Sequence, residues 1–85
     1  MPVETEQRIN ETIARRVRAL RISKGIKVED LAQTLSLKSH SVTRIENGHS
    51  TMSASQLVRM AQALGVLVSV IVGDIPANHT ENANG

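Results

Sequence analysis

The fold is decided by the stretch from Val28 to Gly48, which reads VEDLAQTLSLKSHSVTRIENG. Apolar residues recur in it at helical spacing in two groups, Leu31 with Leu35 and Val42 with Ile45. The segment Ser36-Leu37-Lys38 interrupts this periodicity, and Gly48 stands where a helix would end. We therefore predict two short helices, at 28–35 and 39–47, joined by a turn of about three residues.

A longer helix is expected before this stretch, from about Thr5 to Ser23, with Gly25 as its stop. Its apolar stripe has helical spacing, at Ile9, Ile13, Val17 and Leu20. The opposite face carries Arg8, Arg15, Arg16 and Arg18, a pattern typical of a solvated helix surface.

A fourth helix follows, and it has the strongest start signal of the chain. Ser53 and Gln56 form a capping box, while Met52 and Leu57 occupy the two positions of a hydrophobic staple. Gly65 closes this helix after an apolar stripe at Leu57, Met60, Ala61 and Leu64.

The segment from Val66 to Gly73 admits two structures. Strict alternation of valines favours a strand, yet Val66, Val70 and Ile71 also fit one face of a helix. An apolar strand with unpaired edges needs a partner strand, and a surplus of exposed valines on a helix argues for a contact as well. Either alternative predicts a homodimer with its interface at Val66, Val68, Val70, Ile71 and Val72.

Composition fits one small domain over residues 1–75 and a disordered tail over 76–85. The chain has no Phe, Tyr or Trp, which disfavours functions that stack unpaired bases on aromatic rings. The absence of cysteine excludes disulfides, thiol catalysis and cysteine-ligated zinc. All ten Lys and Arg lie between Arg8 and Arg59, a distribution that fits a phosphate-facing domain.

Nothing in the sequence indicates an enzyme. There is no glycine-rich phosphate loop, and the histidines at 40, 49 and 79 lack metal-ligand spacing. We therefore expect no catalytic residue, no bound metal and no cofactor.

Two short helices joined by a three-residue turn, the second with a polar exposed face, have the geometry of a DNA-reading helix-turn-helix. From about Ile13 to Val72 the chain resembles the Cro and lambda-repressor-like family, also called the Xre family. Four blocks carry the resemblance: RVRALR at 16–21 before Lys24-Gly25, EDLA at 29–32, VTRIENG at 42–48 and AQALGV at 61–66. The resemblance implies a compact all-α domain of five elements, the last of which is either a helix or a dimer-forming strand.

The resemblance also implies roles for individual residues. The third helix would enter the major groove and contact bases through Ser39, His40, Thr43 and Arg44, the last of which can bind guanine O6 and N7. Phosphates would be contacted by Lys38, by Ser41 and by the backbone of Asn47, Gly48 and His49. Arg21 and Glu46 match a pair that forms a largely internal salt bridge in this family. The alternative for the exposed residues is an ordinary solvated helix face.

The sequence departs from the family pattern at three places. Ser36 stands where a turn glycine is common, and Lys27 and Lys38 stand where Ser, Thr or Asp often caps the two helices. Val28 replaces a glutamine that typically contacts the DNA backbone. These departures bear on the contacts with DNA, not on the fold.

Together these features predict a transcriptional repressor that binds a palindromic double-stranded operator as a homodimer, with its recognition helices about 34 Å apart. The main alternative is an antitoxin that binds a toxin and autoregulates its operon, and a third is an interaction module that has lost DNA binding. The longest apolar run, 64–72, is too short to cross a bilayer, and no signal peptide is apparent. We therefore expect no membrane partner and a cytoplasmic, nucleoid-associated protein.

Overall fold

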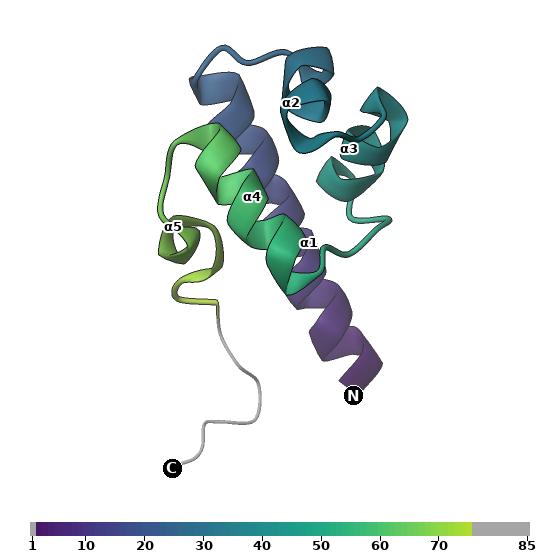
Figure 1. Ribbon diagram of the computed structural model, residues 1–85. Helices are drawn as coiled ribbons and strands as arrows, with labels where there is room; N and C mark the ends of the chain where they lie inside the picture. The colour runs from purple at the N-terminus through teal and green to yellow at the C-terminus, as the bar shows by residue number, and fades with distance from the viewer. Residues whose placement is uncertain (1, 76–85) are drawn as a thin grey trace.

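The computed structural model describes the backbone of residues 2–75 and the side chains of residues 6–75. Over this range the chain forms five helices and no strand (Figure 1): α1 Pro2–Ser23, α2 Val28–Leu35, α3 Ser39–Glu46, α4 Ala54–Leu64 and α5 Val68–Val72. The expected all-α class with five elements is confirmed. The tail predicted for residues 76–85 lies outside the described residues.

The helix boundaries follow local signals in the sequence. Ser53 accepts a hydrogen bond from the Gln56 backbone N–H while the Gln56 side chain accepts one from the Ser53 N–H, so the predicted capping box of α4 is confirmed. α2 has the predicted limits, and α3 ends at Glu46 with Asn47 as its C-cap. α1 begins at Pro2, earlier than expected, because proline is well tolerated in the first turn of a helix.

All five helices contribute to one core. α2 packs against α3 and α4, α1 packs against α3 and α5, and α4 packs against α5. In Figure 1, α1 and α4 are drawn along the same diagonal, with α2 and α3 on one side of them and α5 on the other. The largest fully buried side chains come from all of them: Val17, Leu31, Val42, Met60, Leu64 and Ile71. Close packing of short helices suits these aliphatic side chains, which are well buried without any aromatic ring.

The strand considered for residues 66–73 is wrong, because this segment contains the helix α5. In a strand, Val68 and Val70 would share a face, but here Val68 is half-buried against the core and Val70 is exposed. Ile71 is fully buried, and the Arg16 guanidinium donates hydrogen bonds to the carbonyls of Ile71 and Gly73. Burial of Ile71 and these bonds at the helix end outweigh the β-propensity of the valines, which depends strongly on context.

Candidate nucleic-acid interface

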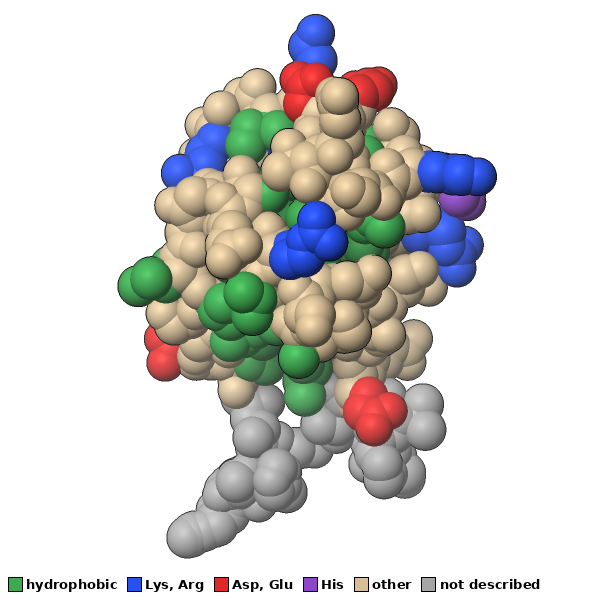
Figure 2. Space-filling model, viewed as in Figure 1, with side chains coloured by type: hydrophobic (Ala, Val, Ile, Leu, Met, Phe, Trp, Pro, Cys, Tyr) green, Lys and Arg blue, Asp and Glu red, His purple; other side chains and the backbone are tan. Residues whose placement is uncertain are grey.

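α3 exposes one face and buries the other. Val42, Ile45 and Glu46 are buried, and the helical period places His40, Thr43 and Arg44 on the exposed face. Figure 2 shows Lys or Arg side chains together with a histidine at the edge of the molecule where Figure 1 draws α3. The result is a polar, basic helix face, braced from behind by the core.

Of the four predicted base-contacting residues, the structure brings three together on this face. His40, Thr43 and Arg44 are exposed, and Ser39 is half-buried at the first position of α3. All four lie within one eight-residue helix, so a groove wide enough for a helix would meet them together.

Arg44 is held by the loop that follows α3. Its Nε donates to the Ser50 hydroxyl at 3.3 Å, and its Nη2 donates to the His49 carbonyl at 3.2 Å. Both bonds are exposed to solvent, so exchanging them for contacts to DNA costs little. Ser50 was not among the predicted site residues, because its proximity to Arg44 depends on how the loop folds back.

The predicted phosphate contacts divide into two groups. The side chain of Lys38 is exposed and that of Ser41 is half-buried, and Lys38 makes no capping bond to the first turn of α3. The backbone of the 47–49 loop, in contrast, has no free donor. The N–H groups of Asn47, Gly48 and His49 donate to the carbonyls of Thr43, Ile45 and Arg44. The backbone donors of this loop are therefore used within the subunit, whereas the side chains of Asn47 and His49 are exposed, and the phosphate contact of this loop stays a prediction.

The loop needs a glycine at position 48 for its conformation. Gly48 has φ +78°, which non-glycine residues seldom adopt, whereas a Cβ at this position would meet only ordinary contacts with Glu11. The positive φ turns the chain away from α3 so that the next residues can reach Arg44.

Arg21 and Glu46 form a salt bridge, with Nε and Oε2 2.7 Å apart. The Glu46 side chain is only 5% exposed and that of Arg21 only 13%. The hydrogen bond with Glu46 is the main cause of a raised pKa for Arg21, and desolvation acts in the opposite direction. The pair fixes the end of α3 to α1 from the side opposite the exposed face.

The residues predicted for a dimer interface do not all lie on one surface. Val70 is 47% exposed, whereas Val66, Val68 and Val72 are half-buried against the core. Ile71 is fully buried within the subunit and cannot contribute to an interface, because its side chain is a core residue. Leu67, the N-cap residue of α5, was not among the residues predicted for the interface, yet it is 74% exposed. Only a helical wheel of this segment would have grouped Leu67 with Val70.

Comparison with known proteins agrees with this architecture. The family described as helix-turn-helix domain matches residues 12–70 of the chain. No curated protein matches the sequence.

Several solved structures have a similar fold. The restriction-modification controller protein C.AhdI from Aeromonas hydrophila is 28% identical with a TM-score of 0.69, covering 72% of this chain and 92% of its own. The hypothetical transcription factor NHTF from Neisseria is 29% identical with a TM-score of 0.73, covering 86% of this chain and 82% of its own. The clp gene regulator ClgR from C. glutamicum, 23% identical with a TM-score of 0.73 over 75% of this chain and 82% of its own, shares the fold.

The family match spans both helices of the 28–48 stretch, and the fold is similar to those of the two solved structures with 28% and 29% identity. The chain therefore belongs to the helix-turn-helix domain family, as a protein of the Cro and lambda-repressor-like, or Xre, type.

Proposed function

We propose that this protein is a transcriptional repressor that binds a specific double-stranded DNA site as a homodimer. The observation that carries the proposal is α3, whose exposed face presents His40, Thr43 and Arg44 while its other face is anchored in the core. Two of the similar structures support it, since they are those of a restriction-modification controller protein and of a hypothetical transcription factor.

In this proposal, α3 lies in the major groove and its exposed side chains contact base edges. Arg44 releases Ser50 and the His49 carbonyl and binds guanine through O6 and N7. Lys38, Ser41 and the side chains of Asn47 and His49 contact phosphates on either side of the groove. Phosphate contacts position the protein, and the base contacts specify the sequence.

The proposed dimer contact involves α5 and the adjacent part of α1. Leu67 and Val70 are exposed apolar side chains, and Val70 lines a shallow hollow with Ala19 and Leu20. Figure 2 shows hydrophobic side chains gathered where Figure 1 places α5. A two-fold axis at this surface would cover both copies of the patch at once, and it would match a palindromic operator.

No specific observation favours the antitoxin alternative. That alternative would dock either a strand over residues 66–73 or the tail onto the toxin; residues 68–72 form the helix α5, and the tail lies outside the described residues. An interaction module without DNA binding is the competing outcome of the test below.

The test begins with selection of bound duplexes from a random library, followed by fluorescence anisotropy with the selected and a scrambled duplex. We expect affinity for the selected duplex to fall steeply with salt, and Arg44→Ala to cost about 1–3 kcal/mol on that duplex alone. Arg15→Ala is the matched control, because Arg15 is an exposed arginine of α1. Equal binding of both duplexes would contradict sequence-specific recognition.

The dimer is tested separately by sedimentation equilibrium. The double variant Leu67→Glu with Val70→Glu should be monomeric, because burying two carboxylates in an apolar contact is costly. Ile22→Glu, at another exposed apolar residue, should leave the dimer intact. The proposed homodimer would be contradicted if the wild-type protein were monomeric at micromolar concentration and also bound the selected duplex as a monomer.

A further inference from the structure

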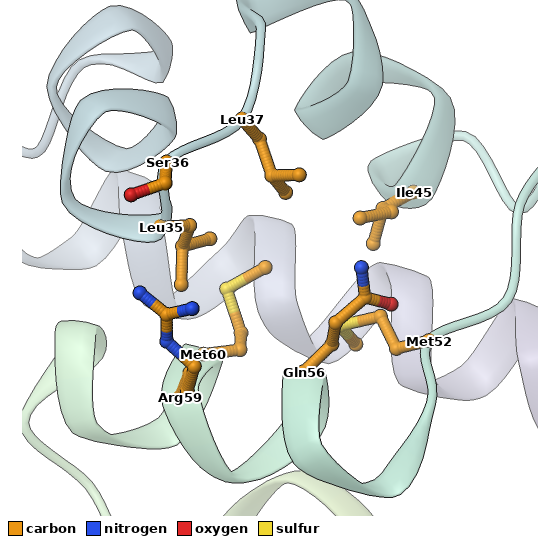
Figure 3. Close-up of a pocket in the computed structure, with 8 residues that line it drawn as sticks. All are labelled: Leu35, Ser36, Leu37, Ile45, Met52, Gln56, Arg59 and Met60. Atoms are coloured by element: carbon orange, nitrogen blue, oxygen red, sulfur yellow. The ribbon is translucent and has the colours of Figure 1, made fainter.

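A pocket of about 190 Å³ opens between the α2–α3 turn and α4 (Figure 3). Most of its lining is apolar, and Leu35, Ile45 and Met60 in it are buried core residues. An engineered apolar cavity of about 150 Å³ can hold benzene, so this pocket accommodates a compact organic group of about that size.

The polar groups of the lining stand beside the apolar walls. Figure 3 shows the Arg59 guanidinium beside Leu35 at one end of the pocket, and the Gln56 amide directed toward Ile45 at the other end. The Gln56 oxygen accepts a hydrogen bond from the Ser53 N–H, which leaves the amide N–H₂ as the donor toward the pocket. The pocket thus offers one cation and further hydrogen-bond donors next to an apolar surface.

This donor set calls for an anionic ligand. No acidic residue lines the pocket, and among the residues with described side chains the structure has a single salt bridge, which does not involve Arg59. A carboxylate matches the planar guanidinium through two parallel hydrogen bonds. An apolar body of the same molecule would lie against Leu35, Ile45 and Met60, where it would displace water from apolar surface.

We propose that this pocket binds a small monocarboxylate with a compact apolar body, its carboxylate on Arg59 and its body against the core. The site goes beyond the proposed function and does not depend on DNA binding. Its walls include Leu37 of the turn and Ile45 of α3, so a bound molecule contacts the same two-helix unit that carries the exposed face.

The experiment uses the full chain with ¹³C-labelled methionine methyl groups, because Met52 and Met60 both line the pocket. Cyclohexanecarboxylate is the probe, and cyclohexylmethanol is its neutral counterpart of the same shape. Titration without DNA should give saturable shifts of both methyl resonances, with the carboxylate binding about tenfold more tightly than the alcohol, the equivalent of about 1.4 kcal/mol.

Arg59→Gln should remove that tenfold advantage and leave the affinity for the alcohol unchanged. Arg59 is exposed, so this substitution leaves the core intact, and Arg15→Gln on α1 is the matched control that should bind like the wild type. The proposal is overturned if the two methyl groups show no saturable shift, if acid and alcohol bind equally, or if Arg59→Gln and Arg15→Gln bind the acid alike.

Discussion

The Arg21 guanidinium binds the Glu46 carboxylate through two hydrogen bonds, Nε to Oε2 at 2.7 Å and Nη2 to Oε1 at 3.1 Å. Its remaining nitrogen, Nη1, donates to the Ile26 carbonyl at 2.9 Å. One side chain thus joins the end of α1, the turn before α2 and the end of α3. The proposed recognition helix is therefore fixed at the end opposite its leading turn.

Arg21→Met should destabilise the protein by about 3–5 kcal/mol in urea unfolding, because it leaves the buried Glu46 carboxylate without its partner. The double variant Arg21→Met with Glu46→Leu should recover most of this loss, since it removes both charges. Arg18→Met, at an exposed arginine of the same helix, is the control. A single variant as stable as the control would show that the pair contributes little.

The same pair also predicts a pH dependence. Folding raises the pKa of Arg21. The charged guanidinium therefore makes its full contribution to the free energy of unfolding at any pH below the pKa of an unfolded arginine. This contribution is lost only as the pH rises through the pKa of Arg21 in the folded protein. The free-energy difference between wild type and Arg21→Met should therefore not shrink between neutral pH and about pH 10. Urea unfolding at several alkaline pH values measures it, and a difference that fades within this window would contradict the assignment.

Arg16 should hold α5 against α1. Its Nη1 donates to the Ile71 carbonyl at 3.0 Å and also to the Gly73 carbonyl, at the end of α5 where carbonyls lack helical partners. Arg16→Gln should cost about 1–3 kcal/mol and speed amide hydrogen exchange in α5 more than in α4. Arg15→Gln is the neighbouring control, and equal protection of α5 in both variants would show that Arg16 is dispensable.

Ser36→Gly should stabilise the protein by about 0.5–1 kcal/mol, because Ser36 ends α2 with φ 57° in the left-handed region, where glycine is favoured. Gly65→Ser is the reciprocal change at the end of α4, where φ is 71° and a Cβ would have open space. It should destabilise by a similar amount for conformational reasons alone. Thermal unfolding measures the change in stability of each variant relative to the wild type. A destabilised Ser36→Gly variant would mean that the Ser36 side chain makes a favourable contact.

Lys27→Ser and Lys38→Ser should each stabilise the protein by about 0.5–1.5 kcal/mol, because both lysines are N-caps that make no side-chain capping bond. Their effects on DNA should differ. Lys38→Ser should weaken binding to specific and random duplexes alike and lower the salt dependence of binding, because one phosphate contact is lost. Lys27→Ser should change neither the affinity nor its salt dependence. If Lys38→Ser left the salt dependence unchanged, the phosphate contact assigned to Lys38 would be wrong.

The local sequence predicted most of the helical framework. The capping box at Ser53 fixed the start of α4, and the interruption at Ser36-Leu37-Lys38 separated α2 from α3 at the observed residues. These signals are local, since capping, periodicity and helix-terminating glycines act within one or two turns of the chain. The exposed face of α3 follows from the same periodicity, because the positions of Val42 and Ile45 determine where His40 and Arg44 must point.

The sequence by itself therefore determined the number and order of helices over most of the chain, and it indicated which face of α3 is polar. Tertiary structure alone decided the form of residues 68–72, where burial of Ile71 and the bonds from Arg16 outweigh the strand propensity of the valines. It also decided that the backbone N–H groups of residues 47–49 are used within the subunit, and that Arg44 lies against Ser50. The physical reason is the range of the interactions: these outcomes depend on contacts between chain segments or on how a loop folds back, which residue propensities do not encode.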